Sequence, residues 1–256
     1  MITAEIIEQR FYALKDDAQR LHLMRFFKTG KGQYGEGDDF LGIKVPDTRS
    51  IVKSIKNQVQ IPEMFPEIKK LLYSTWHEVR LCGLLLLVEM MKANLPQKKD
   101  SDEVRDLKSR TRKDIAEFYL THARQANNWD LVDLSCQYIL GPYIRFSKDD
   151  NYEILYNLAE SDNLWEQRIS IVTTLDFIRN GDFIPTLTIC DRLLDHHHDL
   201  IHKAIGWTLR EVGKKDINAL TRYLEKNYSR LPRTSLRYAI ERMPESERRL
   251  WLTRKP

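Results

Sequence analysis

The sequence predicts an all-α fold built as a solenoid of paired helices. Apolar residues recur three or four positions apart almost throughout, as on one face of a helix, and no segment alternates like a strand. Glycine (10) and proline (9) are scarce among the 256 residues, so the chain lacks the many tight turns of an all-β protein. A period of 35 residues, described below, is typical of two-helix repeats.

The elements follow from these apolar stripes. The first stripe begins with Ile6, Phe11 and Leu14, and the second contains Leu21, Met24 and Phe27. The same spacing predicts further helices over 45–57, 62–74, 77–93, 102–122, 128–140, 152–160, 164–179, 185–194, 200–212, 218–227 and 235–242. Three prolines, Pro46, Pro62 and Pro185, lie near predicted helix starts, where a missing N–H costs nothing. Asn127 and Asn128 are predicted to cap the helix that follows them.

One loop stands out from the helical pattern. Five of the ten glycines lie between Gly30 and Gly42. The segment is not a P-loop, because Gly-Lys-Ser/Thr is absent and no strand precedes it. It is either a flexible connection between helices or a loop whose N–H groups contact a phosphate backbone together with Lys28 or Lys31. A second linker spans 93–102, but no break in composition divides the chain, so we expect a single domain over 1–256.

Composition narrows the class of protein. No apolar stretch approaches the roughly 18 residues of a membrane span, and acidic residues stand near the N-terminus where a signal peptide carries cations. Cys82, Cys136 and Cys190 are odd in number and form no C-x-x-C pair, which favours buried thiols over disulfides or a zinc site. We therefore expect a cytoplasmic protein, nucleoid-associated if bacterial. No oligomerisation seam is evident, so we expect a monomer.

The charge distribution favours a polyanionic partner. Residues 201–256 hold 14 Lys and Arg against 6 Asp and Glu, while the rest of the chain holds 27 against 31. A basic segment on a mildly acidic body is typical of nucleic-acid binding. A solvated basic face is the alternative.

The 35-residue period places charged residues in register. Asp133, Arg168 and Lys203 follow one another at intervals of 35 residues. Each lies four residues after the first residue of a similar segment, and these first residues are Trp129, Leu164 and Asp199. Equivalent positions of a solenoid line one face, so a carboxylate and two cations are expected side by side. Arg80 resembles the same position in an earlier repeat.

Two tryptophans extend this strip into a candidate site. Trp129 lies four residues before Asp133, and Trp207 lies four after Lys203, so each pair shares a helix face. The site is thus expected to contain Trp129, Asp133, Arg168, Lys203 and Trp207. The alternatives are core tryptophans, an Asp133–Arg168 salt bridge between helices and a solvated Lys203.

Other motifs carry less chemistry. Consecutive helical residues diverge by about 100°, so His196, His197 and His198 cannot chelate one ion from a helix, and His198 with His202 lacks a third ligand. No metal site is predicted. Neither a Gly-x-Ser-x-Gly elbow nor a Cys/His nucleophile pattern occurs, and Trp76, Trp165 and Trp251 are expected to serve packing.

Four strings together resemble the AlkD family of DNA alkylation repair glycosylases. They are FLGIKVP at 40–46, NWDLVD at 128–133, DNLWEQR at 162–168 and IHKAIGWTLRE at 201–211, and the resemblance runs from about residue 20 to about 245. It implies a right-handed HEAT-like solenoid with a concave, basic DNA-binding groove. It also implies a monofunctional glycosylase that removes positively charged N3- and N7-alkylated purines, such as 3-methyladenine and 7-methylguanine, from duplex DNA without a cofactor. The family acts without swinging the damaged base into a protein pocket, unlike most glycosylases.

The resemblance also assigns roles to individual residues. Asp133 matches the catalytic aspartate, Trp129 and Trp207 the two site tryptophans, and Arg168 the site arginine. A carboxylate suits this chemistry because loss of a charged base leaves an oxocarbenium-like sugar, which it stabilises or to which it directs water. Indole faces attract the growing cation. We expect Arg168, Lys203, Arg210 and Lys44 to contact phosphates.

The sequence departs from the founding pattern of that family at two adjacent positions. Asp199 and Leu200 stand where aromatic residues precede the KAIGW helix. Two other functions fit the same fold: a non-catalytic HEAT-repeat protein that binds bent or branched DNA, and a HEAT-type scaffold for protein interactions.

Overall fold

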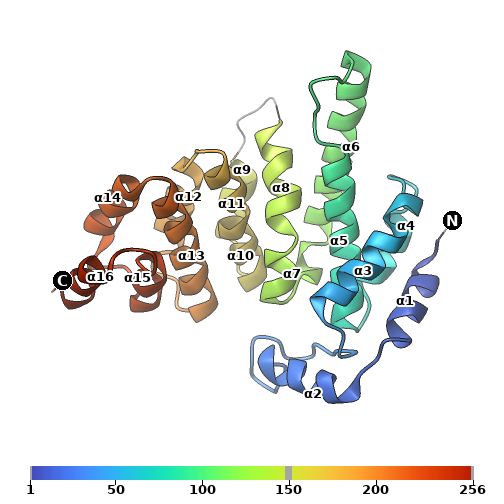
Figure 1. The fold of residues 1–256 in the computed structure, drawn as a ribbon, viewed down its shortest axis with the longest axis horizontal. Coiled ribbons are helices and arrows are strands. Elements are labelled where there is room, and N and C mark those ends of the chain that lie inside the picture. The colour runs from blue at the N-terminus through green and yellow to red at the C-terminus, as the bar shows by residue number, and fades with distance from the viewer. Residues whose placement is uncertain (1, 148–151, 255–256) are drawn as a thin grey trace. The chain divides into compact units, whose positions relative to one another are not determined.

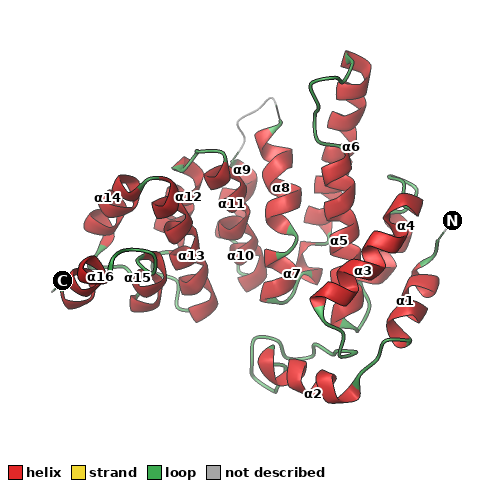
Figure 2. Ribbon diagram, in the orientation of Figure 1, coloured by secondary structure: helices red, strands yellow, loops and turns green. Residues whose placement is uncertain are grey.

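The computed structural model describes residues 2–147 and 152–254, and its regular elements are helices throughout these ranges (Figures 1 and 2). The predicted all-α fold is therefore confirmed. Apart from the helices, the described residues contain one isolated β-bridge, between Asp39 and Trp76. The chain divides into two compact units, Met1–Phe146 and Ser147–Pro256, which are described in turn. The single domain expected over 1–256 stays a prediction.

The first unit is built around one almost fully buried helix. Its helices are α1 (Ala4–Tyr12), α2 (Asp17–Phe26), α3 (Val45–Ile55), α4 (Phe65–Leu72), α5 (His77–Ala93), α6 (Asp102–Thr121), α7 (Trp129–Asp133) and α8 (Cys136–Arg145). Short 3-10 turns follow α3 and α6, at Lys56–Gln58 and Ala123–Gln125. Helix α5 contains the longest apolar run of the sequence, 84–88, and packs against α3, α4, α6 and α8. Because its residues 81–88 are apolar or glycine and are buried on every side, α5 forms the core of this unit.

The second unit is centred on α13. Its helices are α9 (Glu153–Ala159), α10 (Leu164–Thr173), α11 (Leu175–Arg179), α12 (Ile184–Leu193), α13 (Asp199–Lys215), α14 (Ile217–Asn227), α15 (Arg233–Ala239) and α16 (Glu245–Thr253). Helix α13 contacts α10, α11, α12, α14 and α15. It comes closest to α15 at Gly206, where an added Cβ would lie 2.4 Å from the Tyr238 Cβ and 2.6 Å from the Ser235 carbonyl oxygen. The glycine of the KAIGW string is thus required by helix packing.

Two predicted helices are interrupted, and at each break a hydroxyl side chain bonds to a backbone carbonyl. The segment 128–140 is wrong as one helix because the chain breaks between α7 and α8, and 164–179 breaks between α10 and α11. At the breaks, the Ser135 hydroxyl donates to the Leu131 carbonyl (2.5 Å) and the Thr174 hydroxyl to the Ile171 carbonyl (2.7 Å). Such bonds compete with helix hydrogen bonding.

Three smaller outcomes complete the comparison with the sequence. Helix α16 was missed because its apolar residues, Leu250, Trp251 and Leu252, are consecutive and form no stripe. Pro62 precedes α4 by three residues, whereas Pro46 and Pro185 lie in first turns as predicted. All three cysteines are buried and none forms a disulfide, as expected.

Candidate functional site

The candidate site in the first unit begins with the cap of α7. The Asn128 side chain accepts the Trp129 N–H (2.9 Å), which confirms the predicted cap. The helix then runs for only five residues, from Trp129 to Asp133. Both end residues are half-buried and line the same cavity of about 410 Å³, so the predicted shared face is confirmed.

Five of the fifteen residues that line this cavity carry aromatic rings, and these rings pack on one another. The Trp129 indole stacks on Phe27, with centroids 5.2 Å apart and planes at 21°, and meets Phe26 edge-on at 5.9 Å. Phe27 also stacks on Phe40 (5.1 Å), and Phe40 on His77 (4.3 Å). Because these rings come from α2, the following loop, α5 and α7, the Trp129 face is held from several sides. The Asp133 carboxylate thus borders a largely apolar cavity, where electrostatic effects are less screened than in water.

The loop that carries Phe40 is fixed by a buried carboxylate. Glu78 accepts three backbone N–H groups at 2.9 Å each, from Leu41, Gly42 and Ile43. Gly42 has φ +90°, and an added Cβ would lie 2.0 Å from the Asp16 carbonyl oxygen, so only glycine fits there. This part of the glycine-rich segment is therefore a turn with a fixed backbone, held by the Glu78 carboxylate. Its end leads to Lys44, which is exposed, caps α3 and lines the mouth of the cavity.

A buried ionic cluster that was not predicted from the sequence lies beside these aromatic rings. The His77 ring contacts Asp38 through Nδ1 (2.7 Å) and Asp130 through Nε2 (2.9 Å). Arg80 pairs with the second oxygen of Asp38 and donates to the carbonyls of Ser74 and Thr75 (2.8 and 3.0 Å). All four charged side chains of the cluster are at most 5% exposed. The adjacent His77 and Glu78 at the start of an apolar helix were the only available signal.

Charge within the cluster sets the protonation of His77. Burial by itself lowers the pKa of His77, but the carboxylates of Asp130 and Asp38 outweigh it and raise the pKa to about 9. Burial by itself raises the pKa of Asp38. The hydrogen bond and charge of His77 and the charge of Arg80 outweigh this effect, so the pKa of Asp38 falls below its ordinary value. His77 is therefore an imidazolium at neutral pH, and the cluster is neutral overall.

The remaining predicted site residues lie in the second unit. Arg168, on α10, is 5% exposed and donates from Nη1 to the Leu200 carbonyl (2.6 Å) in the first turn of α13. Lys203 and Trp207, on α13, are half-buried, and Lys203 pairs with Asp199 at 2.7 Å. The hydrogen bond from Lys203 is the main cause that lowers the pKa of Asp199. Arg210, one turn beyond Trp207, pairs with Glu241 and Glu211.

The predicted 35-residue register appears in the helix boundaries. Helices α7, α10 and α13 begin at 129, 164 and 199, and the side chains of Asn128, Asn163 and His198 cap them. Asp133, Arg168 and Lys203 are each the fifth residue of their helix. Arg80 is instead the fourth residue of α5 and belongs to the buried cluster. The structure thus brings Trp129 together with Asp133, and Arg168 together with the start of α13; one site spanning both units stays a prediction.

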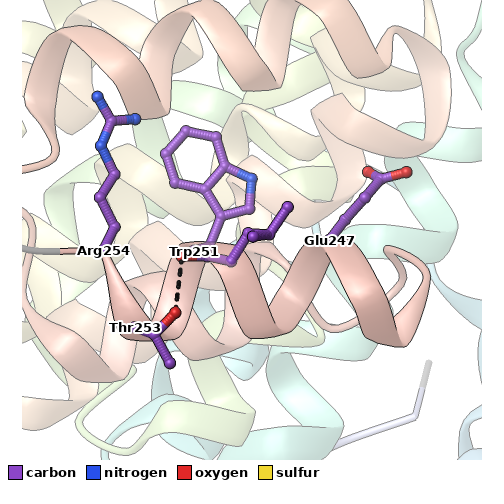
Figure 3. Close-up of a pocket in the computed structure, with 5 residues that line it drawn as sticks. Glu247, Trp251, Thr253 and Arg254 are labelled. Carbon is purple, nitrogen blue, oxygen red and sulfur yellow. Dashed lines mark hydrogen bonds between the residues drawn. The ribbon is translucent and has the colours of Figure 1, made fainter.

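The second unit also has an open pocket of about 490 Å³ at α16, which none of the predicted site residues lines. Figure 3 shows the Trp251 and Arg254 side chains rising from the same helix end, with Glu247 one turn away. The Arg254 guanidinium lies 5.4 Å from the Trp251 ring and 5.1 Å from that of Tyr228. The ring centroids of Tyr228 and Trp251 lie 5.9 Å apart, so the Trp251 side chain takes part in local packing as predicted.

Two other kinds of site are absent from the described residues. Within 2–147 and 152–254, no group of three or more His, Cys, Asp or Glu is arranged to hold a metal ion. In the same ranges, no helix combines the length and the apolar character needed to span a bilayer.

Comparisons with known proteins agree with the resemblance seen in the sequence. A family model described as DNA alkylation repair enzyme matches residues 7–243. Among solved structures, a predicted DNA alkylation repair enzyme from Enterococcus faecalis is similar, with a TM-score of 0.68 and 15% sequence identity over 90% of this chain and 97% of that one. At this identity the likeness shows a shared fold. A search of curated proteins found no significant match. Because the family match extends over nearly the whole sequence, the chain belongs to the DNA alkylation repair enzyme family.

Proposed function

We propose that this chain is a monofunctional DNA glycosylase that excises positively charged N3- and N7-alkylated purines, of the 3-methyladenine and 7-methylguanine type, from duplex DNA. Membership of the family gives it a role in the repair of alkylated DNA. The observation that carries the finer proposal is the Asp133 carboxylate one helical turn from the Trp129 indole, both on the wall of an aromatic cavity.

The reaction requires little from the protein beyond charge stabilisation. The C1′–N bond breaks and its electron pair moves to the alkylated base, which becomes neutral and leaves. Water then adds to C1′ and loses a proton, which yields an abasic site and the free base. Since the base carries its own positive charge, it needs neither a proton donor nor a cofactor. The carboxylate of Asp133 stabilises the oxocarbenium-like sugar or orients the water, as carboxylates do in glycoside hydrolysis.

The surroundings of Asp133 suit this role. The cavity wall is mostly apolar, so the carboxylate acts through a medium of lower dielectric than water. The Trp129 face, fixed by Phe27, supplies a further attraction for positive charge of roughly 0.5–2 kcal/mol. Trp207 is proposed to act in the same way from α13.

Contacts with duplex DNA are proposed for basic residues of both units, acting as one DNA-binding domain in a monomer. Lys44 is exposed beside the cavity, and Lys203 and Arg210 lie on α13. Phosphate contacts of this kind give affinity without sequence preference. For Arg168, burial and its bond to the Leu200 carbonyl favour a role in holding the first turn of α13 over direct contact with phosphate.

Release of free base from a 7-methylguanine-containing duplex tests the proposal. Wild-type protein is expected to release free 7-methylguanine and to leave alkali-labile abasic sites, while an undamaged duplex of the same sequence yields neither. Salt-dependent binding of the duplex without base release would instead support a non-catalytic protein that binds bent or branched DNA. The absence of both would contradict a function on duplex DNA.

A further inference from the structure

The short helix α7 is tied to the rest of its unit by buried polar contacts on two of its residues. Asn128, its cap, donates to Asp38 at 3.1 Å, and Asp130 accepts from His77 at 2.9 Å. Five residues are far too few for a helix to be stable alone, so tertiary contacts must fix its orientation. Asp130 lies between Trp129 and Asp133 in the sequence. Its contact with His77 therefore acts on the segment that carries both candidate site residues.

The geometry of His77 requires a charged ring. Its two nitrogens each face a carboxylate oxygen, Asp38 Oδ2 at 2.7 Å and Asp130 Oδ2 at 2.9 Å. A neutral imidazole has a single N–H and would leave one of these contacts as a lone pair facing an anion. Both carboxylates are buried, so the loss of one donor inside the cluster is costly.

From this geometry we infer that His77 is a positioning residue for the reaction. Its imidazolium bridges Asp38 and Asp130, and the bridge holds α7 so that Trp129 and Asp133 line the cavity. This inference rests on the proposed function for its effect on base release, but the bridge itself is testable without any substrate. A link by packing reinforces it, since Phe27 lies against both His77 (5.0 Å) and Trp129 (5.2 Å).

The bridge gives the site a defined dependence on pH. The charged groups around His77 are Asp38 from the loop, Asp130 from α7, and Glu78 and Arg80 from its own helix; Lys44 and Asp133 line the same cavity. Because the pKa of His77 is raised from 6.5 to about 9, the bridge is complete below the ordinary value and is lost as pH rises through 9. In the wild-type protein, α7 should therefore be held less firmly, and base release should fall, as the pH rises through about 9.

Nuclear magnetic resonance of the wild-type protein tests the bridge directly. We expect both imidazole nitrogens of His77 to carry a proton at pH 7 and the ring to lose one of these protons near pH 9. The Trp129 indole N–H resonance should shift in the same step. A neutral His77 at pH 7, or a Trp129 resonance whose chemical shift does not change as His77 titrates, would overturn the inference. These readouts hold whether or not the protein releases bases.

Variants test the effect on the reaction. His77→Gln should lower the single-turnover rate of base release by about tenfold or more, the size expected from a small misplacement of reacting groups, while affinity for undamaged duplex stays within about twofold. Adding Asp130→Asn to His77→Gln restores charge balance and a neutral hydrogen-bonded pair, so it should recover part of the rate and remove the alkaline loss. The matched control is His122→Gln, at the end of α6, whose ring contacts Tyr73 (3.3 Å) outside the cluster.

The outcomes separate this inference from the proposed function. A folded His77→Gln protein with the wild-type rate would refute the positioning role. If His77→Gln does not fold, the double variant decides. A folded double variant with a restored rate of base release supports the charge bridge. A folded double variant that still loses base release near pH 9, as the wild type is expected to do, contradicts it. If the wild type releases no base, the proposed function fails, yet the coupling of Trp129 to His77 in the spectra still decides the bridge.

Discussion

Replacing Glu78 with glutamine should release the turn that leads into α3. The wild-type carboxylate accepts from Leu41 with one oxygen and from Gly42 and Ile43 with the other, all at 2.9 Å, and is 2% exposed. A glutamine in the same position keeps one acceptor oxygen and turns an N–H₂ group toward the Leu41 N–H. One charge-assisted bond is lost and a buried donor is left unpaired, which together cost about 3 kcal/mol.

This cost is measurable in two ways. A loss of about 3 kcal/mol should lower the melting temperature by roughly 6–12 °C for a chain of this size. Hydrogen exchange at the amides of Leu41, Gly42 and Ile43 should accelerate more than exchange in the core of α5. The matched control is Glu89→Gln on the same helix, whose ion pairs with Lys56 and Lys92 are partly exposed and worth at most about 1 kcal/mol. Equal effects of the two variants, or unchanged exchange at 41–43, would refute the reasoning.

Three further predictions concern packing and DNA. Gly206→Ala should cost about 1–3 kcal/mol of unfolding free energy because its Cβ meets backbone and Cβ atoms of α15, whereas Gly213→Ala should cost less because it meets the tip of a leucine side chain; equal losses in denaturant unfolding would contradict this. Trp207→Ala should reduce the rate of base release more than affinity for undamaged duplex, and equal losses in the two assays would make Trp207 a simple binding residue. Lys44→Ala should lower the slope of log affinity against log salt by about one, whereas an unchanged slope in salt titrations would exclude a phosphate contact.

Much of the fold was predictable because amphipathic helices repeat apolar residues every three or four positions in the sequence. The register of Asp133, Arg168 and Lys203 anticipated the starts of α7, α10 and α13, since each repeat begins with a cap at a fixed spacing. The breaks after α7 and α10 were not predictable from periodicity. At each break a hydroxyl side chain, of Ser135 or of Thr174, bonds to a backbone carbonyl of the preceding turn, and apolar spacing does not record such a bond.

The site was predictable only in part. The four-residue spacing of Trp129 and Asp133 placed them on one cavity wall, as a helix requires. The charged cluster that holds α7 in place could not be predicted. Its members His77, Asp38 and Asp130 are far apart in the sequence and are brought together by tertiary packing. Arg168 was expected to contact phosphate, but it is buried and donates to the Leu200 carbonyl, and this depends on how α10 and α13 pack.

The most direct test of the central claim is the single-turnover release of 7-methylguanine from duplex DNA by wild-type and Asp133→Asn proteins. Asp114→Asn, which changes an exposed carboxylate on α6, is the matched control. We predict that Asp133→Asn folds and binds duplex like the wild type but loses most of the base release, while Asp114→Asn keeps it. Release by Asp133→Asn at the wild-type rate would contradict the assignment of Asp133 as the catalytic carboxylate.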